Sequence, residues 1–219
     1  VCASASHIVT PEPRTIIVDM NAVCRRDFAW NTNTITPQQA MAMFWKKHVL
    51  KYPECTLFYF AFDSSDRIPQ TRKDFLRNVR YAKAKDGPSI NPFDADTLNN
   101  TWLEIWSSSQ KGQMWTLLAH CLHYHARVYG APDVVYEIDT PAHGILRCPR
   151  QEGPERYSNF GEADMKAALF ANERATKPVL IKTIDWDMIV QGVAMFPPFV
   201  FVDIGSVWRH NGHTFFSKK

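Results

Sequence analysis

Residues 178–192 read PVLIKTIDWDMIVQG, an apolar run followed by two aspartates, Asp185 and Asp187. The run over 178–184 predicts a strand that is buried on both faces. Two carboxylates this close together repel each other and raise each other's pKa unless a cation or hydrogen-bond donors hold them. Two explanations are open for this stretch. The aspartates form a turn or cap a helix after the strand, or they bind a cation at its end.

Strands and helices alternate along the rest of the chain. Thr36 followed by Pro37 is typical of a helix start, and Asn211-Gly212 is typical of the turn of a hairpin over 205–216. Residues 1–14 are expected to form an irregular arm and 140–160 a long loop. Strands are predicted at 15–20, 56–62, 133–138, 178–184 and 199–203, and helices at 36–50, 69–85, 94–110, 113–129 and 162–174. This order predicts a single α/β domain over 1–219, with a mainly parallel central sheet and helices on both faces.

Composition limits the class of protein. With 45% hydrophobic and 21% charged residues, the 219-residue chain has enough apolar side chains for one sizeable core. The formal charge of +3 permits a polyanionic partner without requiring one. The five cysteines form no CxxC pair, which favours a reducing, intracellular compartment (nuclear, cytoplasmic or viral) over secretion. No apolar run reaches the roughly 18 residues of a membrane span, so no membrane partner is expected.

Acidic residues recur where the predicted strands end. Asp19, Asp63 and Asp185 each follow an apolar run, and GEADMKAA places two more acids at the start of a helix. In a parallel sheet the carboxyl ends of the strands share one edge, where ligands gather near the switch point. Six carboxylates there would repel one another without a metal, and oxygen ligands suit Mg²⁺. Two such ions about 4 Å apart form the centre that cleaves phosphodiester bonds. The pattern therefore favours the cation explanation, with six candidate ligands: Asp19, Asp63, Glu162, Asp164, Asp185 and Asp187.

Four motifs, in order, resemble those of the flap endonuclease/XPG family of 5′ nucleases, which has a PIN-like fold. IIVDMNAV resembles the family's first-strand aspartate motif, and YFAFDSSDRIPQTRKDFLRNVR resembles its FDG…P…K…R stretch. GEADMKAA is similar to SEAEA, and TIDWDMIVQG is similar to TEDMDCLTFG. The match covers about residues 15–192, with little to align in 86–160. It implies a divergent or viral nuclease that uses two Mg²⁺ or Mn²⁺ ions, with the six acids as metal ligands and catalytic residues.

Basic residues follow Asp63 closely. The resemblance implies that this segment begins a helical arch, within an arch-like region over 64–130, that holds the phosphates of a nucleic acid. The alternative is an ordinary solvated helix face. The expected nucleic-acid-binding residues are Arg67, Arg72, Lys73, Arg77 and Arg80.

Several alternatives stay open at this stage. The expected substrate is DNA, branched (flap-shaped) or single-stranded. The alternatives are an RNA-cleaving PIN-like nuclease and a catalytically silent protein that retains the fold and has a nucleic-acid-binding or structural role. The family's seventh carboxylate has no counterpart, because no acidic residue follows Asp203. We interpret Asp203 as a residue of the sheet edge rather than a replacement ligand. Cys121 and His125 have the spacing of a shared metal, but zinc needs about four ligands and no partner pair stands out.

Overall fold

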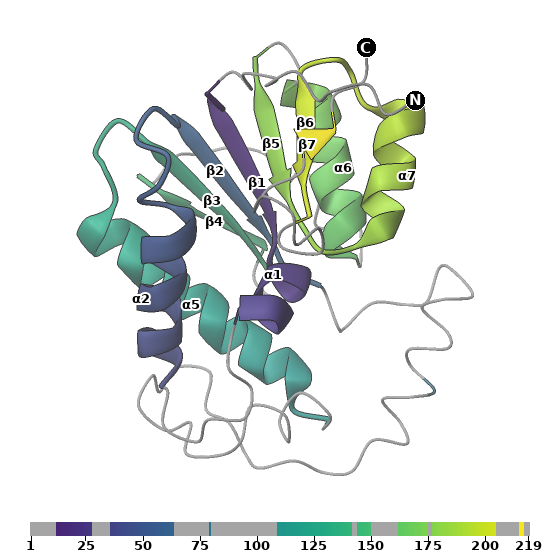
Figure 1. The fold of residues 1–219 in the computed structure, drawn as a ribbon. Helices are drawn as coiled ribbons and strands as arrows, with labels where there is room; N and C mark the ends of the chain where they lie inside the picture. Colours follow the sequence, from purple (N-terminus) through teal and green to yellow (C-terminus); the bar gives the residue numbers. More distant parts are fainter. Residues whose placement is uncertain are drawn as a thin grey trace.

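The fold is built on one sheet. The computed structural model describes residues 12–27, 36–63, 79, 109–141, 144–149, 162–174, 177–204 and 215–216. Within this part the strands are β1 (Thr15–Asp19), β2 (Leu57–Ala61), β3 (Val135–Thr140), β4 (Gly144–Cys148), β5 (Val179–Lys182), β6 (Val200–Asp203) and β7 (Phe215–Phe216). They form one sheet in the order β4-β3-β2-β1-β5-β6-β7 (Figure 1). Strands β3, β2, β1, β5 and β6 are parallel, and the outer strands β4 and β7 are antiparallel to their neighbours.

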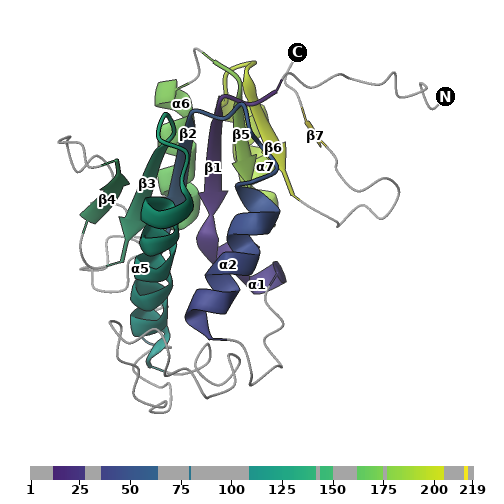
Figure 2. The same cartoon turned by 90° about the vertical axis from the view of Figure 1, so that its left-hand side faces the viewer.

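Helices cover both faces of the sheet (Figures 1 and 2). One face packs against α1 (Met20–Asp27), α2 (Pro37–His48) and α5 (Lys111–Tyr129). The other packs against α6 (Ala163–Arg174) and α7 (Trp186–Met195). Alternate residues of each central strand enter the two cores: in β1, Ile16 lies in the first core and Ile17 in the second. A strand buried on both faces needs apolar residues at successive positions, which explains the continuous apolar runs in the sequence.

The direction of chain winding reverses at β1. From β1 the chain moves outward to β2 and β3, and it later returns to the other side of β1 with β5 and β6. The switch point therefore lies between β1 and β5, at the carboxyl edge of the sheet. Helix α1 begins at Met20, directly after the last residue of β1, and lies at this edge (Figure 1).

The predicted α/β fold with a mainly parallel sheet is confirmed. The helix expected at 36–50 is α2, and Thr36 forms a capping box with Gln39: its hydroxyl accepts from the Gln39 amide at 3.2 Å, and the Gln39 side chain accepts from the Thr36 amide at 3.0 Å. Of the helices expected at 69–85 and 94–110, the structure describes only Val79, which is helical, and residues 109–110, which form a turn before α5.

The prediction of a continuous loop over 140–160 is wrong for Gly144–Cys148, which forms β4 and pairs with β3. Prolines and glycines near this stretch suggested a loop. Gly144 has a φ of 69°, a value that glycine adopts without steric cost, and Thr140 Oγ1 donates to its carbonyl at 2.8 Å. The chain can therefore turn back against β3 here.

The end of the chain adds one short strand. The turn expected at Asn211-Gly212 lies outside the described residues. Strand β7 pairs with β6, with Phe215 opposite Asp203 and Phe216 opposite Val202. Of the described cysteines, Cys24, Cys55 and Cys121 are buried and Cys148 is partly exposed. No helix in the described ranges is long and apolar enough to cross a membrane.

Candidate active site

Asp19 lies at the centre of the carboxyl edge. It is the last residue of β1, and only 4% of its surface is exposed. Its Oδ1 accepts from the Ala22 amide at 3.1 Å, which fixes it against the first turn of α1. Its Oδ2 accepts from Thr183 Oγ1 at 3.0 Å. Because Thr183 directly follows β5, this second hydrogen bond crosses the switch point.

Asp63 connects β2 to the start of α6. Its Oδ1 accepts from the Ala163 amide at 2.9 Å, so it satisfies one of the N–H groups that a helix start leaves without an intrahelical acceptor. Its own amide donates to Asn21 Oδ1 at 3.4 Å, which links it to α1. Ala163 stands between Glu162 and Asp164, so this contact places Asp63 beside both acids of the GEADMKAA motif.

Asp185 and Asp187 lie at the start of α7. Asp185 is the N-cap of this helix, and its Oδ1 accepts from the Asp187 amide at 3.0 Å. The Asp185 amide donates to Thr183 Oγ1 at 3.0 Å, and that same hydroxyl donates to Asp19. The helix-cap explanation of this pair is therefore correct for Asp185. It does not exclude the cation explanation, because Asp185 is partly exposed and Asp187 is exposed, so both side chains are accessible to a cation.

These contacts join the predicted site residues at one edge of the sheet. Hydrogen bonds run from Asp187 through Asp185 and Thr183 to Asp19, and Asn21 leads from α1 to Asp63 and the start of α6. We call the six carboxylates at this place the acidic edge: Asp19, Asp63, Glu162, Asp164, Asp185 and Asp187.

The position of Asp19 is costly for its negative charge. Burial is the main cause that raises the pKa of Asp19 from 3.8 to about 7, and the nearby charges of Asp63 and Asp164 add to it. Hydrogen bonds from Ala22 and Thr183 lower the pKa and offset part of this increase. The charges of three carboxylates therefore interact across β1, β2 and α6. A cation placed among them would relieve both the repulsion and the cost of ionising Asp19.

The donor set of the acidic edge is compatible with a hard divalent cation, because every group is a carboxylate oxygen. Within the described residues, however, no three His, Cys, Asp or Glu side chains are arranged to hold one ion together. Both oxygens of Asp19 and one of Asp63 accept protein hydrogen bonds instead. Mg²⁺ typically keeps several waters and contacts only one or two carboxylates directly. Such an ion would not need three protein ligands in direct contact.

Sequence reasoning missed a second buried group beside the acidic edge. Lys166 of α6 and Asp139 of β3 form an ion pair with Nζ and Oδ1 at 3.1 Å. Tyr59 of β2 donates to Asp139 Oδ2 at 2.9 Å. A signal was present, since Asp139 directly follows the strand predicted at 133–138, as Asp63 follows the strand predicted at 56–62.

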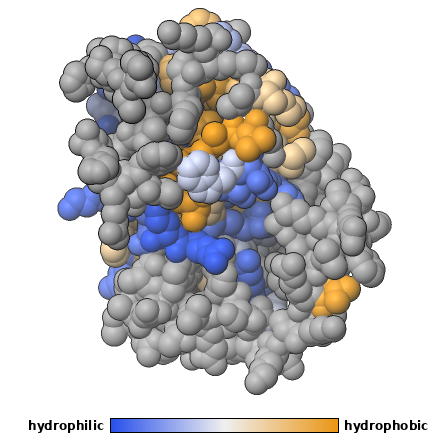
Figure 3. Space-filling model, turned by 45° about the vertical axis from the view of Figure 1, so that its right-hand side comes forward, coloured by the Kyte–Doolittle hydropathy of each residue, from blue (hydrophilic) through white to orange (hydrophobic). Residues whose placement is uncertain are grey.

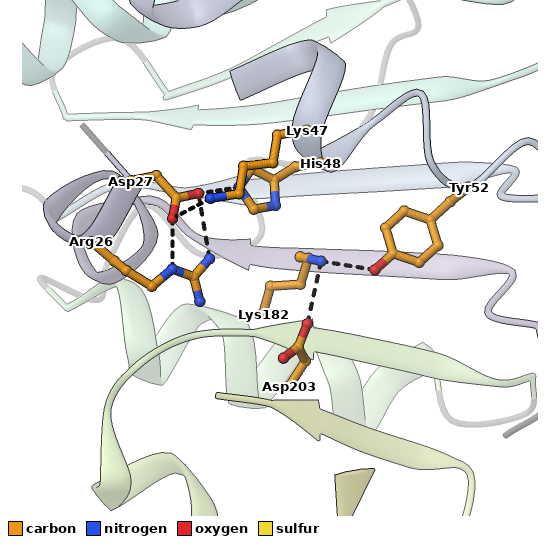
Figure 4. A network of polar contacts seen from close by, with 7 residues as sticks. All are labelled: Arg26, Asp27, Lys47, His48, Tyr52, Lys182 and Asp203. Carbon is orange, nitrogen blue, oxygen red and sulfur yellow. Dashed lines mark hydrogen bonds and ion pairs between the residues drawn. The ribbon is translucent and has the colours of Figure 1, made fainter. Parts of the chain in front are cut away.

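A separate polar network lies on the α1/α2 face of the sheet (Figure 4). Lys182 Nζ donates to Tyr52 Oη at 2.8 Å and lies 3.3 Å from Asp203 Oδ2. In β6, Asp203 shares a face with Phe201 of the α1/α2 core, whereas Asp19 shares a face with Ile17 of the opposite core. This position agrees with the interpretation of Asp203 as a sheet-edge residue that is not part of the acidic edge.

The same face contains a buried acidic residue, Asp27, at the end of α1. Arg26, Lys47 and His48 all bond to its carboxylate. Burial alone would raise the pKa of Asp27, but the hydrogen bonds from His48, Arg26 and Lys47 outweigh it and hold the pKa well below its usual value. Asp27 is thus an anchor between α1 and α2.

The CxxxH spacing on α5 has a structural explanation. Cys121 packs in the core, and His125 Nε2 lies 3.3 Å from the Gln38 carbonyl and stacks on Trp45. His125 thus joins α5 to α2.

Apolar side chains are exposed along the length of α7. Trp186, between the two aspartates, is 47% exposed, and Val190 and Met195 of the same helix are also exposed. The view onto this side of the molecule shows an apolar area beside a hydrophilic one (Figure 3).

The predicted nucleic-acid-binding residues, Arg67, Arg72, Lys73, Arg77 and Arg80, lie outside the described residues, as does most of the arch-like region. The chain matches no protein-family model, and no curated protein matches it. The likeness to the flap endonuclease/XPG family therefore rests on the four sequence motifs.

Proposed function

We propose that this protein is a divalent-metal-dependent nuclease that hydrolyses phosphodiester bonds of DNA, with branched or single-stranded DNA as its substrate. The observation that supports the proposal best is the hydrogen bond from Thr183 to Asp19, which joins acids of α7 and β1 across the switch point. The same edge holds Asp63 and Asp164, whose charges act on Asp19. A structural cap or turn requires one carboxylate, whereas the segments that meet at this edge bear six acidic residues.

The side chains divide into two groups by exposure. Asp19 and Asp164 are buried. Asp187 is exposed, and the remaining three acids are partly exposed: Asp63, Glu162 and Asp185. The more exposed carboxylates are accessible to hydrated cations and would orient their waters. A bound cation would lower the pKa of Asp19, since it would offset the charges of Asp63 and Asp164 that raise it. When bound, Mg²⁺ or Mn²⁺ supplies charge stabilisation for the phosphoryl oxygens and lowers the pKa of water.

An RNA-cleaving nuclease would use the same residues and differ in substrate. A catalytically silent protein that binds nucleic acid is the other alternative. The six acids argue against that alternative, because without a cation neighbouring carboxylates such as Asp19 and Asp63 only repel each other.

The test is a substrate panel. End-labelled flap, duplex and single-stranded DNA and single-stranded RNA are incubated with the protein in Mg²⁺, Mn²⁺ or EDTA. The double variant Asp185→Asn/Asp187→Asn removes two acids of the edge. Asp133→Asn is the matched control, since Asp133 is an exposed aspartate just before β3, at the opposite edge of the sheet.

We expect cleavage of DNA that requires the metal, is lost in the double variant and is unchanged in Asp133→Asn. Cleavage of RNA alone would favour the alternative substrate. Absence of cleavage from every substrate in both metals would refute the nuclease proposal.

A further inference from the structure

The ion pair between Lys166 and Asp139 is one of the most deeply buried features of the protein. The side chains of Lys166 and Asp139 are 0% and 1% exposed. Lys166 Nζ also donates to the Phe62 carbonyl at 2.9 Å. Tyr59 Oη donates to the second carboxylate oxygen of Asp139, Oδ2, at 2.9 Å. We call this group the Lys166 clamp: Tyr59, the Phe62 backbone, Asp139 and Lys166.

The Lys166 clamp holds the last residue before Asp63. The Phe62 amide donates to the Asp139 carbonyl at 3.3 Å, and its carbonyl accepts from Lys166, so the peptide groups on both sides of Phe62 are fixed. The ring of Tyr59 stacks on Phe170 of α6, with centroids 4.1 Å apart and planes within 3°. The clamp thus joins β2, β3 and α6 directly behind the contact between Asp63 and Ala163.

Stability alone is a poor explanation for such a pair. Taking two charges out of water costs free energy that their attraction often fails to repay, and well-packed apolar residues in their place are often as stable or more so. What an apolar pair would lose is the direction of the hydrogen bond from Lys166 to Phe62. That bond sets where β2 ends relative to α6, and therefore where Asp63 lies relative to Asp164.

We propose that Lys166 is a positioning residue of the acidic edge: paired with Asp139, it holds the end of β2 against α6 and so fixes the Asp63 carboxylate beside Asp164. That the positioned carboxylate serves catalysis rests on the proposed function. The positioning itself is a property of the metal-free protein and can be tested without activity. Asp139 acts as the counter-ion of Lys166.

The protein supplies its own control. Lys182, Asp203 and Tyr52 form a second buried lysine–aspartate–tyrosine group, with side chains of the ion pair 5% and 4% exposed, on the opposite face of the sheet. The test variant is Lys166→Met/Asp139→Asn and the control variant is Lys182→Met/Asp203→Asn. Each removes one positive and one negative charge, so the net charge of the protein is unchanged.

The first measurement is amide hydrogen exchange by NMR in EDTA. The Ala163 amide has no acceptor within its helix and bonds to Asp63, so its protection reports the position of that carboxylate. The amide of Ile17, in the central strand, reports global unfolding. We expect Ala163 in the test variant to exchange at least tenfold faster relative to Ile17 than in wild type. The control variant should leave this ratio unchanged.

The second measurement is Mn²⁺ binding by the same proteins, for which we expect at least a tenfold weaker Kd in the test variant only. Unchanged Ala163 protection in the test variant, or equal loss in both variants, would refute the positioning role. If wild type binds no Mn²⁺ and cleaves nothing, the proposed nuclease function fails instead. The exchange ratio then still decides whether Lys166 positions Asp63.

Discussion

Replacing Asp19 by asparagine should change how the stability of the metal-free protein depends on pH. Asp19 in the folded state has a pKa of about 7, whereas in the unfolded chain it loses its proton near 3.8, the ordinary pKa of an aspartate. The folded state therefore holds more protons between these values, and the contribution of Asp19 to stability is lost as the pH rises through this window. Asp19→Asn cannot ionise and should not show that loss.

The size of the effect follows from the shift. Three pKa units correspond to about 4 kcal/mol at 1.36 kcal/mol per unit, of which about a third is already lost at pH 5. The free energy of unfolding of Asp19→Asn minus that of wild type should therefore rise by about 3 kcal/mol between pH 5 and pH 8. At pH 8 the variant should be the more stable protein, even after weaker hydrogen bonds to Ala22 and Thr183 cost about 1 kcal/mol.

The assay is urea unfolding in EDTA at intervals from pH 5 to pH 8, followed by circular dichroism. Taking the difference between two proteins removes contributions that both share, such as that of His48, whose pKa is lowered by burial. Asp27 also cancels, because its lowered pKa affects stability only at more acidic pH. Asp133→Asn serves as the control for a general change of net charge. A difference that stays constant within about 0.5 kcal/mol across this range would refute the account of Asp19.

Four further outcomes are expected. Asp187→Asn should reduce cleavage at least a hundredfold without lowering the melting temperature in EDTA; unfolding or full activity would make Asp187 structural only. Mn²⁺ at a hundredfold excess over its Kd should stabilise wild type by about 2.7 kcal/mol. A melting temperature that Mn²⁺ does not raise, or raises equally in Asp185→Asn/Asp187→Asn, would contradict this. Thr36→Ala should cost about 1 kcal/mol in urea unfolding through the lost capping box, and no change would argue against the box. Arg72→Ala/Arg80→Ala should weaken DNA binding and flatten its salt dependence, and unchanged binding would indicate a solvated helix face.

The sequence was most informative where a structure depends on neighbours along the chain. The helix start at Thr36 and Pro37 is such a case, because the cap and the first helical position are adjacent in the sequence. The apolar run before Asp19 also predicted its strand correctly, since burial on both faces leaves a continuous apolar pattern. From the parallel arrangement of these strands, the meeting of Asp19 and Asp63 at one edge could be predicted as well.

Features that depend on packing between distant segments could not be predicted in the same way. Lys166 reads as an ordinary polar residue of a helix, and only its place against β2 and β3 shows that it is buried with Asp139. Strand β4 was missed because its pairing with β3 depends on the backbone of Gly144 rather than on an apolar pattern. Asp185 shows that two explanations that the sequence presents as alternatives can both apply to one residue. Its side chain caps α7, and the residue also belongs to the acidic edge.

The two hydrogen bonds that assemble the acidic edge have a consequence for the order of folding. Thr183 and Asp19 are 164 residues apart along the chain, and Ala163 and Asp63 are 100 apart. Contacts of such long sequence separation close large loops and form slowly. During synthesis, β1 and β2 leave the ribosome long before their partners in α6 and β5 exist. A nascent chain therefore has the first two carboxylates but not the edge, so any activity of the edge begins only after synthesis has passed α7.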